Sequence, residues 1–497
     1  MRTGIRLIKN ANKWPDRKAI ISNNKSYTYQ NLLNSSEIVA THLLREKHDL
    51  AETRVCFLVT PGFEYTALQW GIWRAGGIAV PLCVQHPLPS LEYVINNSRS
   101  EILIVDENYI ESIDPIIKQK KVIVYKTSEL FVKKTLASLP IIEENRRALI
   151  LYTSGTTSQP KGVVTTHANI NFQIETLVTA WRWQPNDHIV NVLPLHHVHG
   201  IINIMSCALN VGACCQFVTK FDAGKLWNLF TMGKINLFMA VPTIYFKLID
   251  YWVNASAEKQ SQLSDAISSF RLMVSGSAAL PVPVLEKWRQ ISGHTLLERY
   301  GMTEIGMAIS NPFEGERRPG HIGQALPGVN IRLWNEDGIV EDENIAGEIQ
   351  IKGPNVFLEY WEKPEATKQS FTNDGWFKSG DIALLSNGYY KILGRDSVDI
   401  IKSGGYKISA LEIEDVIRKH PSINDCAVVG IPNDEWGEIV SACLVIAKNK
   451  KVDIEEINSW LKKQIAPYKL PRKYIFLKEL PRNVLGKVTK NKLKNQF

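Results

Sequence analysis

The alternation of apolar runs with amphipathic stretches in the first half of the chain limits its possible folds most. Short apolar runs such as RVCFLVT, SEILIVD and KVIVY are separated by stretches with helical spacing, for example TYQNLLNSSEIVATHLL. This alternation is typical of strand, helix, strand units, in which helices cover parallel sheets. We therefore predict an α/β fold, with two parallel sheets in a large N-terminal domain.

The pattern changes toward the C-terminus. From about 320 to 394, short runs such as GVNIRLW and GEIQIKG are separated by glycine and proline turns, which predicts a small antiparallel β-barrel-like subdomain. After Gly394, a helix over SALEIEDVIRKH and strand-like runs around it predict a smaller α+β domain. A chain of 497 residues is too long for one core. We place the boundary at Arg395, so that residues 1–394 form the N-terminal domain and residues 395–497 form a C-terminal lid domain.

Composition and charge narrow the possible partners. The content of 44% hydrophobic and 22% charged residues is ordinary for a globular protein. From Lys451 to Phe497 there are 12 lysines and arginines against 4 acids, which equals the net charge of +8 for the whole chain. No aromatic stacking platform accompanies this basic tail, so we expect no nucleic acid and favour polyanionic small molecules.

The distribution of cysteines and polar residues bears on the compartment. The seven cysteines are odd in number, form no C-x-x-C pair and lie mostly in apolar runs, which predicts reduced thiols. The uncharged segment from Gly200 to Val218 contains several polar residues, so we expect a buried helix and a core strand and no membrane span. We expect a cytoplasmic protein, and a mitochondrial one is the less favoured alternative.

The segment TSGTTSQPKG carries the strongest sign of a binding site. Hydroxyl groups, free backbone N–H groups and a lysine in one short loop suit a polyphosphate. The preceding ALILY and the following VVTTH both read as extended, so the loop joins two strands at a sheet edge; a flexible surface connector is the alternative. The order differs from a P-loop because Lys161 precedes Gly162. We expect phosphate contacts from Thr153, Ser154, Gly155, Thr156, Thr157 and Lys161.

Three further segments follow in order: RYGMTE, then GWFKSGD with Gly394 and Arg395, then PRNVLGK. With the opening loop, they resemble the adenylate-forming superfamily of acyl-CoA synthetases, luciferases and nonribosomal adenylation domains. The segments LPLHHVHG, FMAVPTIY, VSGSAALP and LLERYGMTEIGM are similar to the malonyl-CoA and methylmalonyl-CoA synthetases. The resemblance, from about Asp16 to the C-terminus, implies that ATP activates a carboxylic acid as an acyl-adenylate, which coenzyme A then attacks.

The resemblance also assigns residues to the nucleotide. It implies that Thr303 contacts the α-phosphate and that Glu304 binds Mg²⁺, a hard cation suited to a carboxylate. Asp381 corresponds to the group that accepts both ribose hydroxyls, and Arg395 to its basic partner. The resemblance places Gly276, Ser277 and Ala278 on one side of the adenine slot and Tyr300 on the other; core packing is the alternative role for Tyr300.

The resemblance implies a mobile C-terminal domain with two working positions. In the first, Lys487 bridges the carboxylate and the α-phosphate, a role that suits a point charge on a long stem. In the second, the domain has turned, and a loop with Gly404 and Gly405 lies against the pantetheine of CoA. We place the hinge between Asp396 and Asp399, at Ser397.

The residue before the YGMTE motif bears on which acid is activated. If Arg299 faces the pocket, an unpaired buried cation is costly, so the substrate should carry a second carboxylate. The alternative is a structural ion pair with Glu298 or another acid. We expect His199 and Met307 in the same pocket and His197 as the gate beside it. Three histidines within four residues also suit a metal, but no nearby cysteine or acid completes a set, so we expect no zinc.

The leading hypothesis is an ATP-dependent malonate–CoA ligase that works through malonyl-AMP, with malonate, ATP and CoA as its small-molecule partners. The alternatives are a synthetase for methylmalonate or another short acid, and a standalone enzyme that loads a carrier protein. We expect a monomer or a weak homodimer.

Overall fold

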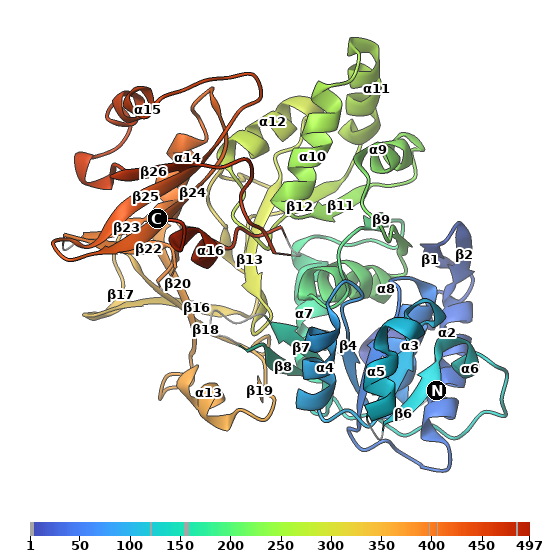
Figure 1. Cartoon of the computed structure of the whole chain (residues 1–497). Helices are drawn as coiled ribbons and strands as arrows, with labels where there is room; N and C mark the ends of the chain where they lie inside the picture. The colour runs from blue at the N-terminus through green and yellow to red at the C-terminus, as the bar shows by residue number, and fades with distance from the viewer. Residues whose placement is uncertain (1–3, 120–121, 154–158, 397, 405, 484–485) are drawn as a thin grey trace.

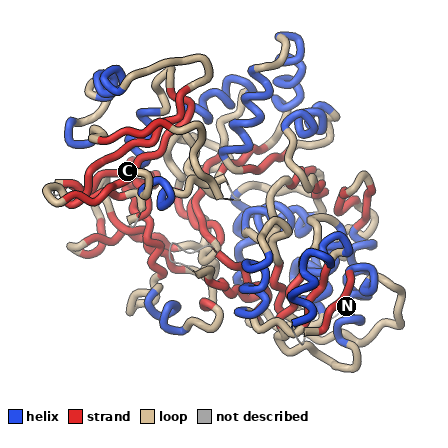
Figure 2. Tube along the Cα trace, viewed as in Figure 1, coloured by secondary structure: helices blue, strands red, loops and turns tan. Residues whose placement is uncertain are grey.

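The computed structural model describes residues 4–119, 122–153, 159–396, 398–404, 406–483 and 486–497. Within this part of the chain the strands form four sheets. Figure 1 shows the N-terminal elements (blue to green) and the C-terminal elements (orange to red) on opposite sides of the molecule, and Figure 2 shows that helices cover the N-terminal sheets.

One sheet has seven strands in the order β19-β8-β7-β4-β3-β5-β6. The five strands from β7 to β6 are parallel, whereas β8 and β19 are antiparallel to their neighbours. The strands are β3 (Arg54–Leu58), β4 (Ile78–Pro81), β5 (Ile102–Val105), β6 (Ile123–Lys126), β7 (Arg147–Thr153), β8 (Lys161–Thr166) and β19 (Glu359–Tyr360). The connecting helices are α3 (Phe63–Arg74), α4 (Leu88–Asn97), η1 (Glu107–Tyr109), α5 (Ile110–Gln119) and α6 (Thr127–Leu130).

The second sheet has nine strands in the order β15-β14-β13-β12-β11-β9-β10-β1-β2, parallel from β13 to β1 and antiparallel at both ends. The strands are β1 (Lys18–Ser22), β2 (Lys25–Thr28), β9 (His188–Asn191), β10 (Cys214–Phe217), β11 (Leu237–Ala240), β12 (Leu272–Ser275), β13 (Leu297–Met302), β14 (Gly306–Ser310) and β15 (Gln324–Ala325). The helices are α1 (Arg6–Ala11), α2 (Tyr29–Leu44), α7 (His167–Ala180), η2 (His199–Ser206), α8 (Cys207–Val211), α9 (Ala223–Thr231), α10 (Pro242–Val253), α11 (Ala257–Ser268) and α12 (Val282–Ser292). The two expected parallel sheets are thus confirmed.

Local sequence explains where the long helices begin. Thr28 and Thr166 each accept a hydrogen bond from the backbone N–H of an asparagine three residues later, and that asparagine side chain accepts one in return. Such capping boxes satisfy backbone donors that a helix start leaves unpaired. The uncharged segment after Gly200 forms buried helical turns and then β10, as expected, and its first part is a π-helix, η2. Among the described residues, no helix combines the length and apolar character needed to cross a membrane.

The third sheet is antiparallel, in the order β17-β16-β18-β20-β21, and occupies the segment where antiparallel strands were expected. It contains β16 (Asn330–Asn335), β17 (Gly338–Val340), β18 (Gly347–Lys352), β20 (Phe377–Ser386) and β21 (Tyr389–Arg395), with α13 (Pro364–Gln369) beside it in sequence. The C-terminal sheet combines β22 (Ile400–Ser403), β23 (Tyr406–Ser409), β24 (Ile423–Asn433), β25 (Gly437–Ile446) and β26 (Lys473–Phe476) with α14 (Ala410–Ile417), α15 (Ile454–Leu461), η3 (Pro467–Lys469) and α16 (Lys490–Lys494). Since Arg395 is the last residue of β21, the boundary there stays a prediction.

Candidate active site

The candidate site lies where two neighbouring parallel strands end. Strand β12 pairs with β13 in parallel and is followed directly by Gly276, Ser277 and Ala278. Strand β13 carries Arg299 and Tyr300 and is followed by Thr303 and Glu304. Because carboxyl ends of parallel neighbours lie at one edge of the sheet, the VSGSAALP and RYGMTE segments come together there.

A tyrosine, an aspartate and an arginine meet beside this edge, from three different strands. Tyr300 donates a hydrogen bond to Asp381 Oδ2 at 2.7 Å, and Arg395 Nε donates to Asp381 Oδ1 at 3.1 Å. Burial and then the Asp381 carboxylate raise the pKa of Tyr300, so the phenol stays a donor. Each carboxylate oxygen keeps a second lone pair, which suits the two hydroxyls of a ribose.

The buried carboxylate of Glu304 lies near a tyrosine and a lysine. Tyr360 in β19 donates to Glu304 Oε1 at 2.9 Å, and Lys161 Nζ is 4.7 Å from the centroid of the Tyr360 ring. Burial raises the pKa of Glu304, while the Tyr360 hydroxyl and nearby cations oppose the rise. The carboxylate keeps oxygen lone pairs, which is the donor type that Mg²⁺ takes. No sequence motif indicated Tyr360, because it reaches Glu304 only through the pairing of β19 with β8.

The polyphosphate loop joins antiparallel neighbours. Thr153 at the end of β7 faces Lys161 at the start of β8 in the strand register, so the loop between them connects the two strands, as expected. Strand β8 is covered by β19 and is therefore not the edge strand. Of the residues assigned to this loop, Ser154, Gly155, Thr156 and Thr157 lie outside the described residues.

Arg299 is the most unusual charge of the site. Its side chain is only 4% exposed, and its guanidinium donates to Ser277 Oγ at 3.2 Å, an oxygen that also lies 3.1 Å from His199 Nδ1. Burial lowers the pKa of Arg299 to about 9, and its Nε has no hydrogen-bond partner among the residues that the structure describes. A Cβ at Gly276 would lie 2.5 Å from Arg299 Cζ, so the arginine needs a glycine at this position.

Within the described part of the chain, no acid pairs with Arg299. Glu298 points to the other face of β13, as alternate residues in a strand do, and accepts a hydrogen bond from the backbone N–H of Gly320 at 3.3 Å. Burial raises the pKa of Glu298 to about 8. The alternative of a structural ion pair between Arg299 and Glu298 is therefore wrong.

The segment of residues 196–199, called the histidine segment below, lies against the same region. His199 is buried at the start of η2, and burial followed by the charge of Arg299 lowers its pKa well below the usual value. His197 is half-buried, and burial followed by the charge of Lys487 lowers its pKa to about 4. Both imidazoles are therefore neutral at physiological pH. Ser277 has φ +69°, a conformation uncommon outside glycine, at the point where it contacts His199 and Arg299.

Met307 and Thr303 flank this group. Met307 is buried in β14, where it pairs with Gly301 of β13, and its backbone N–H donates to Gln173. Thr303 is half-buried at the turn between β13 and β14. Their assigned contacts with the acyl group and the α-phosphate stay predictions.

Lys487 reaches the site from the C-terminal domain. Its side chain is exposed to solvent, yet desolvation by its surroundings lowers its pKa, and the charges of Arg395, Asp381, Arg299 and Glu304 act on it as well. At the preceding residue, a Cβ added to Gly486 would lie 2.8 Å from the Thr243 hydroxyl at the start of α10. In Figure 1 this segment (red) extends from the C-terminal sheet to the centre of the molecule. The structure therefore places Lys487 near Arg395, Asp381, Arg299 and Glu304.

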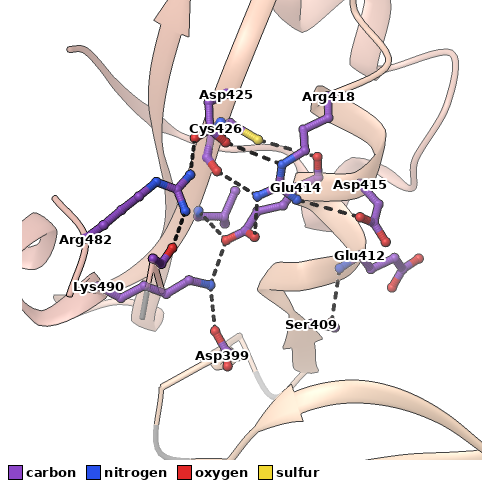
Figure 3. Close-up of polar contacts among 12 residues, drawn as sticks. Asp399, Ser409, Glu412, Glu414, Asp415, Arg418, Asp425, Cys426, Arg482 and Lys490 are labelled. Atoms are coloured by element: carbon purple, nitrogen blue, oxygen red, sulfur yellow. Dashed lines mark hydrogen bonds and ion pairs between the residues drawn. The ribbon is translucent and has the colours of Figure 1, made fainter. Parts of the chain in front are cut away.

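A network of buried charges supports the segment that carries Lys487 (Figure 3). Lys490 Nζ binds Asp399 Oδ1 at 2.6 Å and Glu414 Oε1 at 2.7 Å, and Glu414 also binds Arg418 at 3.1 Å. Asp399 Oδ2 in turn accepts a hydrogen bond from the backbone N–H of Arg395 at 3.2 Å. No local pattern indicated this network, which links the segment before the expected hinge to the start of α16.

The remaining assigned residues belong to the C-terminal domain. Gly404 is exposed with φ +56°, and a Cβ there would lie 2.7 Å from the Trp436 ring, so the position needs glycine. Its backbone N–H donates to the carbonyl of Trp436 at 2.9 Å, which ties it to the C-terminal sheet. The hinge assignment at Ser397 and the CoA assignment at Gly405 fall outside the described residues.

Comparisons with known proteins agree with this arrangement. The chain is 42% identical to the human malonate–CoA ligase ACSF3, mitochondrial, over 97% of this chain and 90% of that protein. It is 39% identical to a malonate–CoA ligase of Arabidopsis thaliana, over 97% of this chain and 86% of that one. The crystal structure of ATP-bound MatB from Rhodopseudomonas palustris superposes with a TM-score of 0.91 at 32% identity, and 99% of each chain is covered.

Two family models match the sequence. The model of the AMP-binding enzymes matches residues 7–361, and the model of the AMP-binding enzyme C-terminal domain matches residues 412–487. The first match covers the polyphosphate loop, Arg299, Glu304 and Tyr360, and the second reaches Lys487. The chain therefore belongs to the AMP-binding enzymes, the adenylate-forming family of acid–CoA ligases.

Proposed function

We propose that the chain is an AMP-forming malonate–CoA ligase, which converts malonate, ATP and CoA into malonyl-CoA, AMP and diphosphate through malonyl-AMP. Relatives that cover nearly the whole chain are malonate–CoA ligases by name. Family membership supports the reaction type, and the acid is argued from the pocket.

The observation that carries the substrate assignment is the unpaired charge of Arg299. A buried guanidinium without an acidic partner is costly, and a dicarboxylate bound beside Ser277 and His199 would supply the missing charge. An arginine can bind a carboxylate through two parallel hydrogen bonds, so it selects for geometry as well as charge. A monocarboxylate would leave Arg299 unpaired, and malonate would not.

In the first half-reaction, one malonate carboxylate attacks the α-phosphorus of ATP and diphosphate leaves. Charge builds on the phosphoryl oxygens, so positioned donors and cations lower the barrier. Lys487 would contact the attacking carboxylate and the α-phosphate, Thr303 the α-phosphate, and Asp381 with Tyr300 the ribose and adenine. Mg²⁺ bound at Glu304 would neutralise phosphate charge. The neutral imidazole of His197 does not add a second cation where Lys487 enters.

In the second half-reaction, the thiolate of CoA attacks the malonyl carbonyl and AMP leaves. In the present arrangement Lys487 is close enough to Arg395, Asp381, Arg299 and Glu304 to be influenced by their charges, so we expect the C-terminal domain to move before the thiol enters. A rotation between Asp396 and Asp399, at Ser397, would remove Lys487 and bring the loop of Gly404 and Gly405 to the pantetheine arm.

Methylmalonate is the second candidate acid. A malonyl-CoA ligase structure that matches this chain with a TM-score of 0.69 at 32% identity has methylmalonyl-CoA and AMP bound. Methylmalonate carries the same two carboxylates, so Arg299 does not distinguish it from malonate. Other short acids and carrier-protein loading remain alternatives that the test below separates.

The test is a diphosphate-release assay over malonate, methylmalonate, succinate, acetate and butyrate, with and without CoA. We expect malonate to give the highest kcat/KM, with methylmalonate next, and the thioester to appear only when CoA is present. Equal rates for malonate and butyrate would contradict the dicarboxylate assignment, and diphosphate release without any thioester would indicate carrier loading.

We further propose a monomer or a weak homodimer. A cytoplasmic location stays a prediction; the names of the vertebrate relatives place those proteins in mitochondria. Sedimentation analysis and localisation of the tagged full chain check the two statements.

A further inference from the structure

Three side chains that the proposed mechanism does not use converge beside the histidine segment. Cys83 and His86 lie just after β4 of the seven-stranded sheet, and His196 precedes η2 in the segment after β9 of the nine-stranded sheet. Their ligand atoms, one sulfur and two ring nitrogens, all lie within 4.8 Å of one another. The absence of a nearby cysteine was the reason to expect no zinc, and that premise was wrong, because the fold places Cys83 next to His196.

The sulfur of Cys83 lies in a turn that supplies it with backbone hydrogen-bond donors. Cys83 is only 6% exposed, and burial raises its pKa, but the backbone N–H groups of Gln85 and His86 donate to its sulfur and oppose the rise. The N–H of His86 also lies 3.1 Å from the carbonyl of Cys83, which closes the turn. Hydrogen bonds from backbone donors stabilise a sulfur that carries negative charge, the form that binds metal.

The two imidazoles supply two nitrogen ligands. His86 and His196 are both half-buried, and a neutral imidazole binds a metal through one of its ring nitrogens. The Nε2 atom of His196 is buried and has no hydrogen-bond partner in the described structure. The ring of His86 lies edge-on to that of His196, with 5.5 Å between centroids. A buried nitrogen without a partner is costly, and a metal ion would satisfy it.

We propose that Cys83, His86 and His196 form a binding site for Zn²⁺, with the fourth position open to water. One thiolate and two imidazoles are a borderline-soft set that suits Zn²⁺, whereas Mg²⁺ takes oxygen ligands. With Zn–S of about 2.3 Å and Zn–N of about 2.0–2.1 Å, the ligand atoms of a tetrahedral site lie about 3.5 Å apart, so the present atoms, which lie within 4.8 Å of one another, would approach one another on binding.

The site would join the two parallel sheets next to the active site. His196 and His197 have ring centroids 4.1 Å apart, so an ion on His196 would restrict the segment that carries His197. The ion would therefore act as a clamp between the end of β4 and the histidine segment, and it would take no part in the transfer of the acyl group.

The test is Co²⁺ titration of the EDTA-treated, reduced full chain, because Co²⁺ occupies zinc sites and reports its ligands by absorption. We expect one Co²⁺ per chain, with the strong visible bands of a tetrahedral site and a thiolate-to-cobalt charge-transfer band that added Zn²⁺ removes. Cys83→Ser should abolish the charge-transfer band, and His86→Gln should weaken binding by about a hundredfold or more, since loss of an outer-shell partner alone costs 10–100-fold. Cys214→Ser is the matched control, because Cys214 is partly buried and lies outside the cluster, and it should change nothing.

Thermal unfolding gives a second measurement that does not depend on cobalt spectra. An ion that binds only the folded state raises Tm, so Zn²⁺ should raise Tm of the wild type and of Cys214→Ser and leave Cys83→Ser unchanged. All three proteins should have similar Tm in EDTA, which checks the fold of the variants. Absence of a charge-transfer band in the wild type, or its persistence in Cys83→Ser, would overturn the proposal.

Discussion

Two buried cations, Arg299 in the N-terminal domain and Lys490 in the C-terminal domain, have opposite surroundings. Lys490 binds two carboxylates, and these raise its pKa although burial opposes the rise. Arg299 is equally buried, has no acidic partner among the described residues, and has its pKa lowered to about 9 by burial. A buried charge that the chain itself neutralises holds the fold together, whereas one that it leaves unpaired is available to a ligand.

The largest expected effect is on the unpaired cation. Arg299→Leu should lower kcat/KM for malonate by more than about a hundredfold, because the distal carboxylate would be left without its partner, at a cost on the order of 3–5 kcal/mol. Butyrate, which has no distal charge, should react as well as before or better. The measurement is kcat/KM for both acids.

Arg317→Leu is the matched control for that variant. Arg317 is half-buried and also has a lowered pKa, but its guanidinium donates to the carbonyls of Pro312, Thr295 and Phe313. We expect this variant to lose stability and to keep its preference for malonate over butyrate. If Arg299→Leu lowers kcat/KM equally for malonate and butyrate, the role of Arg299 is structural.

Lys487 is a third kind of cation, because it is exposed and we expect it to act in one half-reaction only. Lys487→Ala should lower the rate of malonyl-AMP formation by about 10²–10³-fold, the usual effect of removing one donor to a developing charge. Conversion of supplied malonyl-AMP and CoA should stay within a few-fold of wild type, and the exposed Lys492→Ala should affect neither step. Equal loss of both half-reactions would contradict the domain rotation.

The paired cation, Lys490, should contribute to the stability of the C-terminal domain. Lys490→Met leaves Asp399 and Glu414 without their shared partner, so the free energy of unfolding of the C-terminal domain should fall by about 3 kcal/mol. This is the low end for a broken buried pair, because Glu414 keeps Arg418. Urea unfolding followed by a C-terminal probe measures the change, and Lys492→Met, at an exposed position, should stay within about 0.5 kcal/mol. An unchanged midpoint for Lys490→Met would mean that the network does not stabilise the domain.

The pH dependence of the preference for malonate over butyrate tests the charge of Arg299 without a mutation. Arg299 is charged below its pKa of about 9 and loses its charge as the pH rises through that value. The ratio of kcat/KM for malonate to that for butyrate should therefore be constant below about pH 8 and fall up to tenfold per pH unit above 9. Deprotonation of Lys487 should lower kcat/KM for both acids alike, so its effect cancels in the ratio. A ratio that stays flat to pH 10.5 would show that Arg299 is not the group that binds the second carboxylate.

The smallest effect concerns the partner of Glu304. Tyr360→Phe removes a hydrogen bond and keeps the ring beside Lys161, so the cost should be about 0.5–1.5 kcal/mol. We expect a several-fold rise in the Mg²⁺ concentration needed for half-maximal adenylation, and little change in KM for malonate. A change in the KM for malonate alone would place Tyr360 in the acyl pocket.

Much of the fold and part of the site follow from local sequence. The alternating apolar runs predicted the two parallel sheets, whereas the resemblance to a known family implied that Arg395 is the basic partner of Asp381 and that Tyr300 belongs to the same nucleotide site. The contacts of Tyr360 with Glu304, of Lys490 with Asp399, and of Cys83 with His196 were not predictable. Each joins segments far apart in the chain, and neither periodicity nor a motif indicates which distant strands and turns will meet.

Asp399 limits how the C-terminal domain can turn. Its Oδ2 accepts the backbone N–H of Arg395, before the expected pivot, and its Oδ1 binds Lys490, three residues after Lys487. A rotation between Asp396 and Asp399 would break the bond to Arg395 and keep the bond to Lys490, because Asp399 and Lys490 both lie after the expected hinge. Asp399, Lys490 and the segment that carries Lys487 would then move together, so that the ion pair keeps Lys487 in a fixed place relative to the turning domain.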